Sequence, residues 1–159
     1  MRLGEEPQSG EPLEVGDLRV AVAVATFNAP VTNGLRDGAL TWLQATGIED
    51  ITVVEVPGAF ELPIVSRRLA GTHDAVVALG AVILGDTDHY DHVAHRASEG
   101  LQQVMLETDT PVAFGILTVR DADHALVRSR PGPGNKGAEA AEAAVRTAAL
   151  MRDLDALDV

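Results

Sequence analysis

The chain has 159 residues, of which 46% are hydrophobic, and this length fits one domain with a sizeable core. It contains no cysteine and carries a net charge of -12, which excludes disulfides, thiol nucleophiles and thiolate metal sites and argues against nucleic-acid or anionic-lipid partners. No apolar run approaches the roughly 20 residues that span a bilayer, and no signal-like segment leads the chain, so we expect a cytoplasmic protein.

The first elements can be assigned from composition and periodicity. Residues 1–17 predict a flexible tail because Gly, Pro and Glu dominate them, and we expect a single α/β domain at 18–159. The short apolar run Arg19–Ala25 is typical of a parallel strand buried on both faces. Apolar residues at helical spacing from Val31 then predict a helix that stops at Gly47.

The same alternation of strand and helix continues along the rest of the chain. Apolar runs predict strands at 51–56, 75–84 and 111–119, and helical spacing predicts helices at 60–69, 90–107, 122–128 and from about 136 to 154. Asn135 is the expected N-cap of the last helix. Four strands alternating with helices predict a three-layer, flavodoxin-like sandwich with a four-stranded parallel sheet.

In such sheets ligands bind beyond the carboxyl ends of the strands. Phe27 and Asn28 follow the first strand, where a flavodoxin would have a Gly-, Ser- and Thr-rich phosphate loop. Phe27 could stack on a planar heterocycle, since aromatic faces attract one another, or it could cap the core. A flavodoxin-like electron carrier is disfavoured because the phosphate loop is missing.

After the second strand comes the segment VPGAFELP, in which Glu61 lies among apolar neighbours at the start of a helix. We expect this carboxylate to be partly buried. It could accept hydrogen bonds from ligand hydroxyls, or it could only stabilise the positive end of the helix.

The turn after the third strand, GDTDHYD, leads into a helix and is the strongest local signal. Helix N-terminal amides and the Thr87 hydroxyl can bind an anion, beside which His89 could transfer a proton. The alternative is a capping turn with Thr87 or Asp88 as N-cap and a solvated histidine. Zinc is disfavoured because His89, His92 and His95 spread over roughly 120° of the helix.

Two cations flank the Gly/Pro-rich linker SRPGPG before the last helix. Arg128 and Lys136 are eight residues apart in an otherwise acidic chain. They could form the positive side of a phosphate pocket, or they could be ordinary surface charges.

Taken in order, these motifs resemble the lumazine synthase family. The resemblance rests on FN after the first strand, VPGAFELP after the second, GxVIxGxTxHYDxV after the third, PVAFGILT on the fourth and R...NKG before the last helix, and it runs from Leu18 to the final helix. It implies condensation of 5-amino-6-ribitylaminouracil with 3,4-dihydroxy-2-butanone 4-phosphate to 6,7-dimethyl-8-ribityllumazine, with release of phosphate. It implies no metal and no cofactor.

The resemblance also implies roles for individual residues. His89 would act as acid and base, while Phe27 would stack on the pyrimidine and Arg128 would bind phosphate. Phe114, Arg128 and Lys136 would come from a neighbouring subunit of a pentamer, so that a monomer would be inactive. The full implied substrate-binding set is Phe27, Asn28, Ala59, Phe60, Glu61, Val82, Ile83, Asp86, Thr87, Phe114, Arg128 and Lys136.

Two departures from the family pattern lie beside the turn. Leu84 stands where many members have Arg, and Asp88 adds a negative charge, so phosphate affinity could be weaker here. The spacing between Arg128 and Lys136 has no insertion, as in members that assemble icosahedral shells. A shell that encloses a riboflavin synthase is therefore possible. Because of Leu84 and Asp88, the alternative function is a shell-forming or flavin-binding relative with reduced catalysis.

Overall fold

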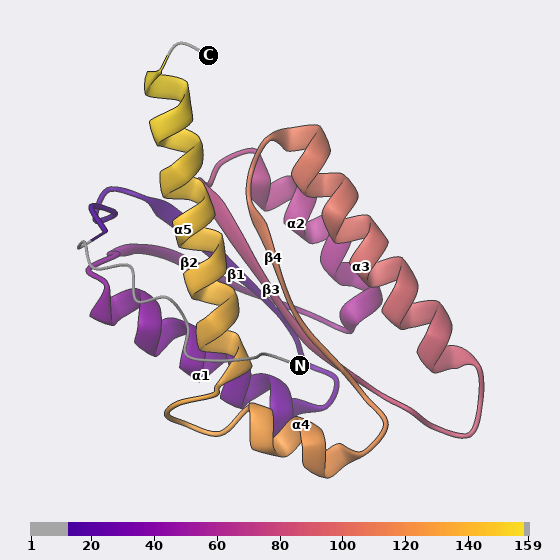
Figure 1. Cartoon of the computed structure of the whole chain (residues 1–159). Coiled ribbons are helices and arrows are strands. Elements are labelled where there is room, and N and C mark those ends of the chain that lie inside the picture. The colour runs from indigo at the N-terminus through magenta and orange to yellow at the C-terminus, as the bar shows by residue number, and fades with distance from the viewer. Residues whose placement is uncertain (1–12, 158–159) are drawn as a thin grey trace.

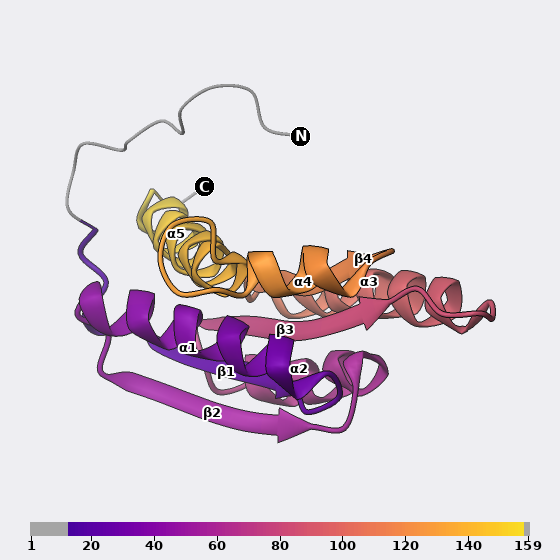
Figure 2. The same cartoon turned by 90° about the horizontal axis from the view of Figure 1, so that it is seen from below.

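A computed structural model describes residues 13–157 of the chain. Its centre is a four-stranded, all-parallel sheet with the strand order β2-β1-β3-β4. Helices cover both faces of this sheet, as Figures 1 and 2 show from two directions. The predicted three-layer, flavodoxin-like architecture is confirmed.

The elements follow the predicted alternation, with boundaries shifted by a few residues at most. In chain order they are β1 (Arg19–Ala25), α1 (Ala29–Ala45), β2 (Asp50–Val56), the 3-10 turn η1 (Ala59–Glu61), α2 (Leu62–Ala70), β3 (Ala75–Ile83), α3 (His89–Thr108), β4 (Val112–Val119), α4 (Ala122–Arg128) and α5 (Lys136–Ala156).

One predicted helix is divided in two. The helix expected at 60–69 begins as η1 and becomes α-helical only at Leu62. Pro63, in the first turn of α2, lacks an N–H donor and is favoured at that position. The division makes Glu61 both the last residue of η1 and the N-cap of α2.

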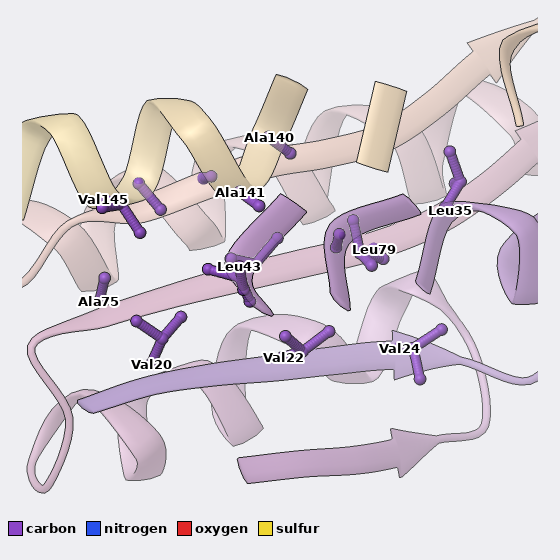
Figure 3. Close-up of a cluster of buried hydrophobic side chains, with 14 of the residues drawn as sticks. Val20, Val22, Val24, Leu35, Leu43, Ala75, Leu79, Ala140, Ala141 and Val145 are labelled. Carbon is purple, nitrogen blue, oxygen red and sulfur yellow. The ribbon is translucent and has the colours of Figure 1, made fainter. Parts of the chain in front are cut away.

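Alternate residues of the central strands face two separate cores. On one face Val20, Val22 and Val24 of β1 pack with Leu79 of β3 beneath α1 and α5, as Figure 3 shows. The other face of β1 carries alanines that pack with residues of α2 and α3. Because β1 and β3 are covered on both sides, they read as continuous apolar runs in the sequence.

The expected flexible tail at 1–17 needs a correction. Its residues 1–12 lie outside the described part of the chain, but Val15 is 1% exposed and belongs to the core under α1 and α5. Asp17 accepts a 2.8 Å hydrogen bond from Arg152 of α5. Leu13 also packs against this core, so the packed chain begins before the predicted boundary.

The register of the parallel strands brings together the segments that follow them. Ala25 at the end of β1 pairs with Val56 at the end of β2, and Ile83 of β3 pairs with Val119 of β4. The segments that follow the strands therefore start at one edge of the sheet, the lower edge in Figure 1. Over residues 13–157, no helix combines the length and the hydrophobicity that crossing a membrane requires.

Candidate active site

A cavity of about 650 Å³ lies at this carboxyl edge, on the side covered by η1 and α3. Eight of the thirteen predicted site residues line it. The lining comes from four segments of the chain and consists of Phe27, Asn28, Pro57, Gly58, Ala59, Phe60, Glu61, Ala81, Val82, Ile83, His89, Tyr90, His92 and Val93.

Backbone hydrogen bonds beyond the end of β1 hold Phe27 at the mouth of the cavity. The Phe27 amide donates to the Pro57 carbonyl at 3.0 Å, which extends the β1–β2 ladder. Asn28 has a left-handed conformation (φ 62°), which Asn tolerates better than most residues, and its side-chain amide donates to the Ala81 carbonyl at 2.9 Å. The Phe27 side chain is 72% exposed, so the alternative that it caps the core is wrong.

Glu61 also lines the cavity, at the junction of η1 and α2. It is half-buried, as predicted, and its side chain makes no capping hydrogen bond to the helix that it precedes. Its Oε2 lies so close to Gly58 that a Cβ built there would be 3.2 Å from this oxygen. Gly58 thus leaves room for the carboxylate beside the cavity.

The end of β3 and the start of α3 form the third wall. Val82 is buried, whereas His89, the first residue of α3, is exposed. Asp88 is the N-cap residue, as one alternative predicted, but its side chain caps no amide, and the Thr87 hydroxyl accepts only a 3.4 Å bond from the His89 amide. The first turn of α3 therefore has no strong side-chain cap.

Sequence reasoning missed several lining residues, of which His92, Tyr90 and Val93 lie on α3. His89, His92 and Val93 are spaced i, i+3 and i+4, so they share one face of the helix. That spacing could have found them once His89 had been assigned to the site.

Five predicted site residues do not line the cavity. Asp86 and Thr87 lie exposed in the turn before α3. Phe114 is 48% exposed on the edge strand β4, and Arg128, at the end of α4, donates to the His124 carbonyl at 2.9 Å. Lys136 forms a 2.7 Å ion pair with Glu139 within α5.

The cavity wall is apolar apart from a few groups with distinct chemistry. Among the described residues that line it, Glu61 is the only carboxylate, His89 and His92 are the titratable imidazoles, and none is Arg or Lys. An aromatic ring can bind a planar heterocycle, a carboxylate can accept from hydroxyls, and an imidazole can transfer protons near neutral pH. Over residues 13–157 no group of three or more His, Cys, Asp or Glu side chains could hold a metal ion.

Comparisons with known proteins find one family. Residues 17–152 match the family described as 6,7-dimethyl-8-ribityllumazine synthase. The chain is 48% identical over 143 residues to the 6,7-dimethyl-8-ribityllumazine synthase of Streptomyces coelicolor, which covers 88% of this chain and 89% of that relative. The protein of the same name from Streptomyces avermitilis is 48% identical over 142 residues, covering 87% and 88% of the two chains.

Proposed function

Because the chain belongs to the 6,7-dimethyl-8-ribityllumazine synthase family, we propose that it makes 6,7-dimethyl-8-ribityllumazine in riboflavin biosynthesis. The substrates are 5-amino-6-ribitylaminouracil and 3,4-dihydroxy-2-butanone 4-phosphate, and phosphate and water are released. The observation that carries the proposal is a cavity that brings an exposed aromatic ring, a half-buried carboxylate and a helix-terminal imidazole together.

The pyrimidine substrate fits the apolar part of this cavity. Its ring would stack on Phe27, whose side chain is exposed at the mouth. The polar ribityl chain would run along Ala59 and Phe60 to Glu61, whose carboxylate can accept hydrogen bonds from its hydroxyls. The backbone at Val82 and Ile83 would read the edge of the ring.

His89 would move the protons of the reaction. Imine formation, elimination of phosphate and ring closure each need a proton moved near neutral pH, and an imidazole can donate and accept in turn. The amides of the first turn of α3, together with the backbone N–H of Asp86 and the hydroxyl of Thr87, would donate to the phosphate next to it, because a helix N-terminus favours an anion. The rest of the rate enhancement would come from holding the two substrates in contact.

The site is incomplete within one chain. Arg128 and Lys136 do not line the cavity, nor does Phe114 on the exposed edge of the sheet. We therefore propose that these three side chains complete the site of a neighbouring subunit in a pentamer. An interface in which one subunit's edge meets another subunit's cavity is heterologous, and it forms a ring when the rotation between neighbouring subunits closes.

Subunit mixing tests this arrangement. His89→Ala and Arg128→Ala chains would be refolded together at equal amounts and assayed with the phosphate-bearing substrate well below KM, where each variant alone has little activity. If the arginine acts on the neighbour's site, about one site in four of a head-to-tail ring carries neither substitution, and activity returns. No recovery in mixed oligomers would mean that the histidine and the arginine serve the same chain's site.

The proposal also covers the size of the oligomer and the compartment in which the protein works. The unbroken spacing from Arg128 to Lys136 supports assembly of pentamers into an icosahedral shell, with a riboflavin synthase as the enclosed partner. The acidic, cysteine-free composition supports a cytoplasmic setting. Analytical ultracentrifugation of the purified protein distinguishes a free pentamer from a shell by mass.

The proposed reaction is tested by mixing purified oligomer with both substrates, with and without a chelator. We expect one free phosphate for each molecule of product, which is measured by its absorbance, and we expect the same amounts with and without the chelator. Absence of product from a correctly assembled oligomer would favour the alternative, a shell-forming or flavin-binding relative with reduced catalysis.

A further inference from the structure

Asn135 is a buried polar residue outside the cavity whose side chain connects three parts of the fold. It is 3% exposed and lies at the N-cap of α5. Its Oδ1 accepts from the amides of Gly137 at 2.9 Å and Ala138 at 3.0 Å, as the sequence predicted for an N-cap. These two bonds use only one end of the side chain.

The other end, Nδ2, bonds to backbone outside α5. It donates to the carbonyls of Gly34 at 3.1 Å, Ser129 at 3.2 Å and Arg130 at 3.0 Å. An amide nitrogen has two N–H bonds, so at least one proton is shared between two carbonyls. An ordinary cap needs none of these contacts.

The neighbouring glycines indicate how closely the parts approach. A Cβ on Gly38 of α1 would lie 2.0 Å from the Asn135 Oδ1, and one on Gly34 would lie 2.3 Å from the Ser129 carbonyl oxygen. Only a residue without a side chain fits either position. The backbone of α1 is therefore in direct contact with both the amide and the linker.

Two cations lie at the two ends of the segment that Asn135 holds. Lys136 follows it directly, and Arg128 precedes Ser129, whose carbonyl accepts from Nδ2. The linker between them contains Gly132 (φ 93°) and Gly134 (φ 86°). Glycine restricts its own backbone angles less than any other residue, so these two positions do little to fix the path of the linker. Without the amide, the Ser129 and Arg130 carbonyls at the linker's Arg128 end would lose their bonds to Asn135, and Asn135 would lose its bond to the Gly34 carbonyl of α1.

We propose that Asn135 is a positioning residue that fixes Arg128 and Lys136 relative to each other and to α1, and so sets the affinity for the phosphate-bearing substrate. This inference rests on the proposed function, which assigns phosphate binding to the two cations. Asn135 touches neither substrate and acts through the linker backbone alone.

Asn135→Asp separates this role from simple capping. Aspartate caps a helix as well as asparagine does, so α5 keeps its N-cap, but the three donor bonds to Gly34, Ser129 and Arg130 are lost. Asn33→Asp is the matched control, because Asn33 is exposed on α1 and the chemical change is the same. Circular dichroism and oligomer mass verify that both variants are assembled.

Three readouts test the proposal. We expect Asn135→Asp to raise KM for the phosphate-bearing substrate by roughly tenfold or more, with KM for the pyrimidine and kcat changed less than about twofold. Binding of inorganic phosphate, measured by calorimetry, should weaken in parallel. Trypsin should cleave after Arg128 faster than in the wild type, and Asn33→Asp should change none of these.

The outcomes separate this inference from the proposed function. A wild type without turnover contradicts the proposed function, but weaker phosphate binding and faster cleavage in Asn135→Asp would still support the positioning role. Unchanged phosphate binding and cleavage in an assembled variant, or equal increases in both KM values, would overturn it. If Asn135→Asp does not assemble, Asn135→Ser, which keeps a capping oxygen but has no amide, replaces it with the same expected results.

Discussion

Replacing Phe27 tests the stacking role of the most exposed aromatic residue at the cavity. Since 72% of its surface is already exposed, Phe27→Ala should leave the free energy of unfolding almost unchanged. A stacked heterocycle that covers about 50 Å² of the ring contributes about 1.2 kcal/mol from area. The preference of aromatic faces for each other adds about 1 kcal/mol.

These two contributions set the size of the effect. Their sum of about 2 kcal/mol corresponds to a roughly thirtyfold increase in KM for the pyrimidine substrate. Phe27→Leu keeps most of the apolar area and loses only the aromatic part, so its KM should rise about fivefold. KM for the phosphate-bearing substrate should stay the same in both variants.

The assay is steady-state product absorbance with each substrate varied in turn, next to thermal unfolding of all three proteins. The ordered series of wild type, Leu and Ala is the expected outcome. Equal KM values in the three proteins, or a lower melting temperature with no change in KM, would refute the stacking role and make Phe27 a structural residue.

Four further substitutions test two residues of the proposed site and two contacts of the fold. His89→Ala should lower kcat by about 10² to 10⁴ at unchanged oligomer mass, since it removes the proton-transfer group; wild-type turnover would remove His89 from the mechanism. Arg128→Ala should raise KM for the phosphate-bearing substrate at least about tenfold and should change KM for the pyrimidine substrate little. Equal increases in the two KM values would contradict the assignment of Arg128 to phosphate binding. Gly137→Ala should lower the melting temperature, at a cost of about 3 kcal/mol, because its Cβ would lie 1.8 Å from a carbonyl oxygen of α1; an unchanged melting temperature would mean that α1 and α5 separate easily. The Arg152 guanidinium holds the pKa of Asp17 below its ordinary value of 3.8, so this pair stabilises the fold above that pH and the contribution is lost as pH falls through the lowered pKa. Arg152→Ala should therefore lower the melting temperature more at neutral pH than in strong acid, where only the bond from Arg152 to the Glu14 carbonyl is lost, whereas a constant difference across pH would exclude the ion pair as its cause.

The fold could be predicted because each layer has a local signature. Strand β1 is covered on both faces, so Arg19–Ala25 reads as a continuous apolar run, and Asn135 has the side chain that an N-cap needs. The burial of Val15 could not be predicted, since Leu13 and Val15 are too few apolar residues in a polar segment to show a period, and they join a core whose other members lie elsewhere in the sequence.

The site was predictable where it follows the ends of strands. Phe27, Glu61 and His89 follow β1, β2 and β3, and a parallel sheet brings those ends to one edge. His92 was missed because it lies one turn inside α3. Which residues of that turn face the cavity depends on how the helix is rotated about its axis, and the sequence does not give that rotation. The bonds of Asn135 to Gly34, about a hundred residues away in sequence, likewise depend on the tertiary approach of α1 and α5.

We propose above that the cavity lined by Phe27 and His89 binds the pyrimidine substrate. A crystal structure of the assembled protein with 5-amino-6-ribitylaminouracil tests it most directly. We expect the ring to be stacked on Phe27 and the ribityl hydroxyls to lie within hydrogen-bond distance of Glu61. Density for the pyrimidine at another site, with this cavity empty at saturating ligand, would contradict it.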